Sequence, residues 1–156
     1  MPAGSDLVTH MAAPEVVSLP HTWRPFGARV AVIFFGAMLV VICAFAWFGF
    51  DPEIRAKFTL FQRATIFFIG MLYVTAGYAI ARSRVVATEA GLLVVNGYKR
   101  RELEWAEIIS IHLPAGAPWA TIDLVDGNTA SMLAIQGSDG DRARAAVRAL
   151  RALINR

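Results

Sequence analysis

Cysteine and histidine are scarce in this chain of 156 residues, and what is missing limits its chemistry. The single cysteine, Cys43, has no partner for an intramolecular disulfide and lies in an apolar run, where it acts as a small hydrophobic residue. Three histidines (His10, His21 and His112) lack Cys or acidic partners at metal-ligand spacing. The sequence contains no Ser-His-Asp order, phosphate-binding loop or close carboxylate pair. We therefore expect a protein that is not an enzyme and that holds no metal and no other cofactor.

Charge is also scarce, and it is unevenly distributed. Charged residues make up 17% of the chain, against about 25% in average soluble domains, and 56% of the residues are hydrophobic. Residues 1–81 hold five of the 15 Lys and Arg residues and four of the 12 acids, so residues 82–156 hold the other ten and eight. An apolar half is thus followed by a polar half, which excludes a purely soluble globule. The small positive excess of the polar half also argues against a nucleic-acid partner.

Two apolar runs predict a membrane hairpin over residues 27–82. Residues 30–50 carry no charge, and a helix of this length spans about 31 Å, close to a hydrocarbon core of about 30 Å. A second run covers residues 64–81, about a dozen residues further on, and Asp51-Pro52 marks a turn between the two. We therefore expect two antiparallel transmembrane helices.

The first 26 residues contain four prolines and show neither helical nor strand periodicity, which predicts a flexible N-terminal tail. Ala44-Phe45-Ala46 after an apolar stretch superficially resembles the cleavage site of a signal peptide. The apolar run continues past this site, however, so we favour a retained helix.

Basic residues near the helix ends predict the orientation. On the side of both termini lie Arg24, Arg29, Arg82 and Arg84, and on the loop side lie Arg55, Lys57 and Arg63. Lys99, Arg100 and Arg101 follow closely and add to the first side. By the positive-inside rule, we expect a multi-pass protein of the cell membrane with both termini in the cytoplasm.

From Arg84 onward, the pattern changes to short strands with hairpin turns. Asn96-Gly97 and Asp126-Gly127 are strong turn signals. Six strands are predicted, over Val85–Thr88, Leu92–Val95, Tyr98–Trp105, Ile108–Leu113, Trp119–Val125 and Thr129–Ile135. A final helix is expected with Ser138 as its N-cap and one apolar face, formed by Ala143, Ala146, Val147, Leu150 and Ile154. This order predicts an antiparallel sheet or barrel over residues 83–156.

Several short motifs carry a resemblance to a known family. They are Thr88-x-x-Gly91-Leu92, a basic turn, Glu104-Trp105-x-Glu107-Ile108, Trp119 and Asp126-Gly127. In this order they resemble the bacterial pleckstrin-homology-like (PH-like) domain of the low molecular weight protein antigen 6 type, found in actinobacteria after two transmembrane helices. The resemblance covers roughly residues 70–156. It implies a bent antiparallel sheet or β-barrel capped by the C-terminal helix, with seven strands usual for the fold, and it implies no enzymatic activity.

The resemblance implies a binding role, because the wider fold class binds lipid headgroups, peptides or proteins. We expect a membrane-anchored scaffold that holds a protein partner or a second copy of itself. The alternative is a sensor of anionic lipid headgroups, and the candidate contacts for lipid or partner are Arg82, Arg84, Lys99 and Arg101. The short acidic loop Glu89-Ala90-Gly91 argues against a phosphoinositide-type pocket. For the basic cluster Lys99-Arg100-Arg101 we favour a solvated strand over a ligand-binding patch, because alternation places Arg100 on the other face. For Trp105 and Ile108 we favour core positions.

Overall fold

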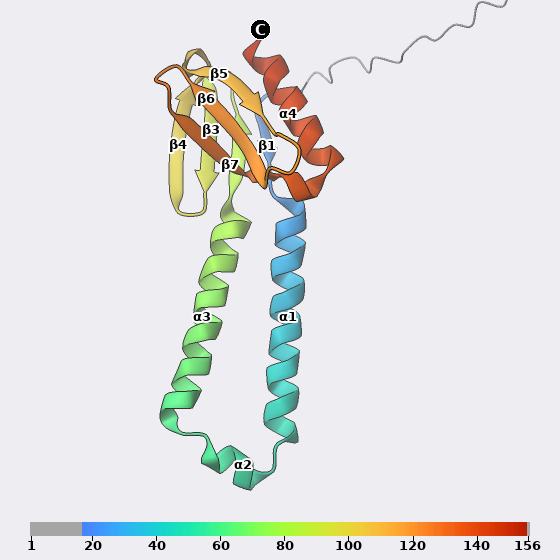
Figure 1. Ribbon diagram of the computed structural model, residues 1–156, viewed down its shortest axis with the longest axis vertical. Helices are drawn as coiled ribbons and strands as arrows, with labels where there is room; N and C mark the ends of the chain where they lie inside the picture. Colours follow the sequence, from blue (N-terminus) through green and yellow to red (C-terminus); the bar gives the residue numbers. More distant parts are fainter. Residues whose placement is uncertain (1–16, 156) are drawn as a thin grey trace, which may run out of the picture.

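The computed structural model describes residues 17–155, which form a helical hairpin joined to a β domain (Figure 1). The hairpin consists of α1 (Phe26–Gly49), the short α2 (Pro52–Lys57) and α3 (Leu60–Arg82). Helices α1 and α3 are long and apolar enough to cross a membrane by length and composition. Both predicted helices are therefore present, and both extend beyond the uncharged runs that indicated them.

Local sequence explains how the hairpin turns. Pro52 is the first residue of α2, where the missing N–H costs nothing because that donor has no partner inside the helix. Thr59 then begins α3 with a capping box. Its hydroxyl accepts from the Gln62 backbone N–H at 3.3 Å, and the Gln62 side chain accepts from the Thr59 N–H at 2.9 Å. The segment between the two long helices, which was expected to be a charged loop, thus contains the short helix α2.

Two antiparallel sheets form the β domain. The first has the order β1-β2-β3-β4 and the second has the order β5-β6-β7. The strands are β1 (His21–Trp23), β2 (Arg84–Ala87), β3 (Gly91–Asn96), β4 (Lys99–Glu104), β5 (Ile108–His112), β6 (Trp119–Leu124) and β7 (Thr129–Gln136). Single-turn helices η1 (Trp105–Glu107) and η2 (Gly137–Asp139) follow β4 and β7, and α4 (Asp141–Ile154) ends the chain.

Strand β1 corrects the prediction of a flexible tail over residues 1–26. Residues 1–16 lie outside the described part, but His21–Trp23 pairs antiparallel with residues 85–87 of β2. Only three residues pair, and Pro20 and Pro25 flank them, so no alternation is visible in the sequence. The domain thus has the seventh strand that the prediction lacked. The helical hairpin is an insertion between β1 and β2, and the domain is not confined to residues 83–156.

The two sheets do not close into a barrel, so the barrel alternative is wrong. Each sheet keeps two edges, and in the first sheet these are the three-residue β1 and the longer β4, whose outer side pairs with no strand of residues 17–155 and is called the free edge below. The core lies between the sheets and under α4, with Leu92, Ile122, Met132 and Leu150 among its fully buried side chains. Every buried hydrophobic residue of the described chain lies between Val85 and Leu153, so the hairpin contributes none to the core.

Two boundaries differ from the prediction for local reasons. In the β3–β4 turn, Gly97 has a φ of +59° and Asn96 remains extended in β3, so the turn is centred on Gly97-Tyr98 rather than on Asn96-Gly97. A glycine at the first central position is typical of a type II′ hairpin. Ser138 lies in η2, and α4 begins only at Asp141 after Gly140. Leu153 is buried in the core, whereas Ile154 is only partly buried.

Candidate functional site at the junction and the free edge

The start of α1 is fixed to the β domain by a distant side chain. The Asp139 carboxylate accepts from the backbone N–H groups of Phe26 at 3.2 Å and Gly27 at 2.8 Å. These are free donors at a helix N-terminus, where a carboxylate also interacts favourably with the helix dipole. The Arg29 guanidinium donates to the Ala81 carbonyl near the end of α3. Both helices are therefore held together where they meet the domain.

The β3–β4 turn is fixed to the end of α3. The Gly97 N–H donates to the buried Ser83 hydroxyl at 2.9 Å, and that hydroxyl donates to the Ala79 carbonyl at 3.1 Å. Further along α3, the Tyr98 hydroxyl donates to the Thr75 carbonyl at 3.2 Å. Thr75 lies seven residues before the end of α3, about 10 Å along its axis. The turn therefore lies beside the helix, below the rest of the domain in Figure 1.

The four predicted contact residues do not form one patch. Arg82 is exposed at the end of α3, and Arg84 is half-buried at the start of β2. Lys99 follows Tyr98 at the hairpin-facing end of β4. Alternation along the strands places Lys99 and Arg101 on the face toward the second sheet and Arg84 on the opposite face. Three of the four bases therefore lie at the end of the domain nearest the helices, on two different faces.

Arg101 has a different neighbour. The pKa of Asp126, in the β6–β7 turn, is lowered first by the Asn128 side-chain hydrogen bond, then by the Asn128 backbone N–H, and to a smaller extent by the charge of Arg101. The side-chain bond has a length of 2.9 Å. Together with its place on the face of β4 toward the second sheet, this makes Arg101 the weakest of the four candidates for a headgroup contact.

A groove that sequence reasoning missed lies at the opposite end of β4. It has a volume of about 550 Å³ and runs between the β2–β3 loop and β4. Its lining includes Leu93, Arg100 and the acids Glu102, Glu104 and Glu107. Arg100 forms an ion pair with Glu102, so the other two acids leave the groove negative. The acids Glu102, Glu104 and Glu107 were a visible signal in the sequence, but only the tertiary structure shows that they line one groove with Leu93.

The aromatic candidates are mainly structural. The Trp105 indole N–H donates to the Thr88 carbonyl at 3.1 Å, and its ring packs against the core. Ile108 is buried, whereas Trp119 is 39% exposed at the start of β6. The prediction of a core position is confirmed for Ile108, whereas Trp105 is only partly buried at the border of the core. Among residues 17–155, no group of three or more His, Cys, Asp or Glu side chains is arranged to hold a metal ion.

Comparison with known proteins identifies the family. The family model of the bacterial PH domain matches residues 82–153, which run from the end of α3 through most of α4. An uncharacterised protein of Mycobacterium tuberculosis and one of Mycobacterium bovis are each 36% identical over 151 residues, 93% of this chain and 94% of the relative. The chain belongs to the bacterial PH-domain family. No solved structure matches it. Bacterial PH-like domains are generally non-catalytic, which supports a binding or scaffold module. The similarity to the mycobacterial relatives also covers the helical hairpin.

Proposed function

We propose that this PH-domain protein is a membrane-anchored binding module. In this proposal α1 and α3 cross the bilayer, and the β domain lies on the cytoplasmic surface with both termini. The exposed apolar surface of the hairpin supports it, since 0% of the apolar window of α1 and 6% of that of α3 is buried. Apolar helices without a protein covering need lipid around them. The low molecular weight protein antigen 6 type is the subclass we propose, from the order of hairpin and domain.

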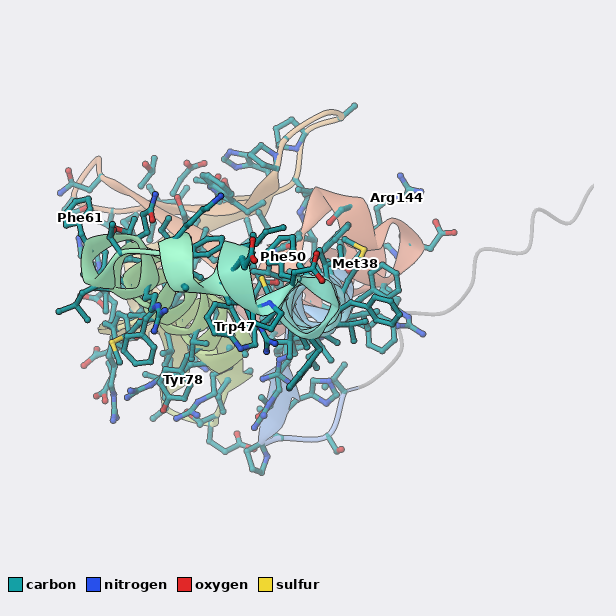
Figure 2. The ribbon with its side chains drawn as sticks, turned by 90° about the horizontal axis from the view of Figure 1, so that it is seen from below. Met38, Trp47, Phe50, Phe61, Tyr78 and Arg144 are labelled. Carbon is teal, nitrogen blue, oxygen red and sulfur yellow. The ribbon has the colours of Figure 1, made fainter. Side chains whose placement is uncertain are left out.

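The view along the helices agrees with a lipid environment. Figure 2 looks from the α2 end, and side chains project from α1 and α3 in all directions. Phe61 and Met38 lie at opposite outer sides of the pair, 79% and 43% exposed. Where the helices do touch, the Tyr73 hydroxyl donates to the Val32 carbonyl at 2.7 Å, a bond that is favourable where no water competes.

The bound partner that we propose is an extended, basic segment of another protein. The free edge of β4 offers unpaired backbone groups, and strand addition at such an edge is a common mode of peptide recognition. Glu104 and Glu107 supply the negative charge that favours Lys or Arg on the partner. The groove over the outer face of β3 and β4, beside this edge, is the observation that carries the proposal.

A second copy of the chain is a poorer occupant of this edge. Strand β4 runs along the long axis of the molecule, roughly parallel to the helices (Figure 1). Two copies in one bilayer are related by a twofold axis along the membrane normal, which leaves the strand direction unchanged. Two β4 strands therefore cannot pair antiparallel within one membrane, and another protein is favoured.

Lipid sensing is the second candidate function, with Arg82, Arg84, Lys99 and Arg101 as contacts. The docking of Tyr98 beside Thr75 supports it, because it brings Lys99 toward the headgroup level. A base near an anionic surface contributes about 1 kcal/mol to the free energy of membrane binding. This is enough to orient the domain but is small compared with the contribution of two inserted helices. We therefore assign these bases to orientation and the groove at β4 to the partner.

Photo-crosslinking in cells tests the groove. Benzoylphenylalanine replaces Leu93, which lines the groove, and in a matched control it replaces Ile109, which is 62% exposed on β5 outside it. We expect an adduct only from position 93, and we expect Glu104→Lys to abolish it, since reversed charge repels a basic segment. Equal adducts at both positions, or an adduct with the mass of two copies of this chain, would contradict the proposal.

A further inference from the structure

A second groove lies at the other side of the domain, between β1 and α4. It consists of two adjoining hollows of about 250 and 400 Å³ that share Trp23, Arg142 and Ala146. The smaller hollow also includes Arg24 and Phe26, which is the first residue of α1. The groove therefore opens at the level where the apolar helix begins. It is separate from the β4 groove, and its lining includes none of the four candidate contact bases Arg82, Arg84, Lys99 and Arg101.

The electrostatics of this groove favour an anion. Arg24, Arg29 and Arg142 lie around the start of α1, and Arg24 is close enough to Arg29 for the two charges to repel. The nearby acid, Asp139, is engaged by the two α1 backbone donors, and Arg29 is engaged by the Ala81 carbonyl. Within residues 17–155, no Asp or Glu forms an ion pair with Arg24 or Arg142.

The donors of the groove are positioned but unused. The Arg142 guanidinium stacks over the Phe26 ring with its central carbon 4.4 Å from the ring centroid. Stacking occupies the face of the guanidinium and leaves the N–H groups at its edge available to a phosphate. Trp23 also lines the groove, and its indole N–H forms no hydrogen bond within residues 17–155. Indole rings of this kind are typical of the membrane interface.

An apolar stripe continues from the groove along α1. Phe26, Val30 and Ile33 share one face of the helix at spacings of four and three residues, and they are 57%, 51% and 71% exposed. A different side of α1, with Val32 and Gly36, packs against α3. A molecule with a phosphate at Arg142 would therefore have an uncovered apolar path directly below it.

We propose that this groove binds an anionic phospholipid, with its phosphate at Arg24 and Arg142 and an acyl chain along Phe26, Val30 and Ile33. This inference rests on the proposed membrane insertion of the hairpin. An anionic headgroup is favoured over a zwitterionic one because a headgroup ammonium would lie among three arginines and one engaged acid. The bound lipid would bridge β1, α1 and α4, so it would stabilise the junction between hairpin and domain.

Native mass spectrometry of the full chain tests this site. The protein is reconstituted into vesicles of equal phosphatidylglycerol and phosphatidylcholine, extracted in mild detergent, and its retained lipids are identified. We expect retained phosphatidylglycerol, with affinity about tenfold weaker in the Arg24→Gln/Arg142→Gln variant, because each lost charge-assisted bond weakens binding strongly. The matched control, Arg82→Gln/Arg84→Gln, removes the same charge at the same level and should retain the lipid. Arg24→Lys/Arg142→Lys should restore much of the retention.

Three results would overturn the lipid site. They are equal retention of phosphatidylcholine, equal loss in both double Gln variants, and displacement of the lipid by millimolar inorganic phosphate, which would indicate a site for free phosphate. Each variant is also tested for flotation with the vesicles and for its thermal unfolding. Unchanged flotation and unchanged unfolding would show that a loss of lipid retention comes from the site and not from a loss of membrane anchoring or folding. Failure of the wild-type chain to float would contradict membrane insertion itself, whereas full flotation without selective retention would contradict only the lipid site.

Discussion

The hairpin and the β domain use hydrophobic residues in opposite ways. In the domain, the large apolar side chains face inward, and 20 hydrophobic residues between Val85 and Leu153 form the buried core. In the hairpin they face outward, and Gly77 is the only buried residue of α3 while α1 has none. The domain is thus stabilised by its own packing, as in water, whereas the hairpin depends on its surroundings for burial of its apolar surface.

The difference matters most where the two regions meet, because the junction is polar. Asp139 holds the start of α1, Arg29 links α1 to α3, and Ser83 links α3 to the β3–β4 turn. These hydrogen bonds lie next to the two connections that join β1 to α1 and α3 to β2. Since the chain crosses the junction twice, the domain is tethered at two points and its orientation relative to the helical hairpin is restricted.

The largest expected contrast between the regions is topological. In a background with Cys43→Ala, Arg55→Cys in α2 should react completely with a membrane-impermeant maleimide in intact cells. Asn155→Cys, at the exposed end of α4, should react only after lysis, because the proposed topology places the bilayer between the two ends of the hairpin. Labelling of position 155 alone would reverse the proposed orientation. Labelling of both positions in intact cells would contradict the proposal that a membrane separates them.

The next largest effect is on the domain core. Leu150 is fully buried in α4, so Leu150→Asp leaves an unpaired charge in the core and should lower the free energy of unfolding by about 3 kcal/mol. Urea unfolding in detergent measures this, with Trp47→Phe leaving only the tryptophans of the domain as fluorescence reporters. The control is Arg148→Asp, which introduces the same side chain on the exposed side of α4. It should change the free energy of unfolding by less than about 0.5 kcal/mol. Unchanged unfolding of Leu150→Asp would refute the docking of α4.

A smaller effect is expected at the junction. Asp139→Ala removes the acceptor of two α1 donors and should destabilise the start of that helix by about 1 kcal/mol. Hydrogen exchange at the amides of Phe26 and Gly27 should then become about fivefold faster while the core of the domain exchanges at its former rate. Ser138→Ala in the same turn is the control. Faster exchange throughout the domain would indicate that Asp139 supports the fold rather than the tether.

The smallest effect is expected from the bases that the sequence made most conspicuous. Lys99→Ala/Arg101→Ala should leave the full chain in the membrane fraction after a high-salt wash, because the hairpin anchors it and each base contributes only about 1 kcal/mol. Urea unfolding of the double variant, compared with that of the unsubstituted chain, serves as the folding control. Release of the double variant into the supernatant, or loss of a stereospecific headgroup complex, would favour the lipid-sensor alternative.

Short-range patterns predicted most of the elements. Uncharged runs predicted α1 and α3, and Asp126-Gly127 predicted the β6–β7 turn, where Gly127 has a φ of +79°. Six of the seven strands and the apolar face of α4 were also visible, because alternation and helical spacing are properties of consecutive residues. The site was predicted less well. Arg82, Arg84 and Lys99 do lie at the end nearest the helices, but on two faces, and the placement of Arg101 depends on its contact with a different sheet.

By itself, the sequence determined where the chain is apolar, where it turns, and that a small β domain with a terminal helix follows two long helices. Only the tertiary structure decided that His21–Trp23 is the first strand of that domain, which makes the hairpin an insertion. A three-residue strand has too few residues to show a period, and its stability comes from pairing with β2 rather than from local propensity. For the same reason Asp139 and Arg142 acquire their roles only when more than 110 residues of chain fold back to the start of α1.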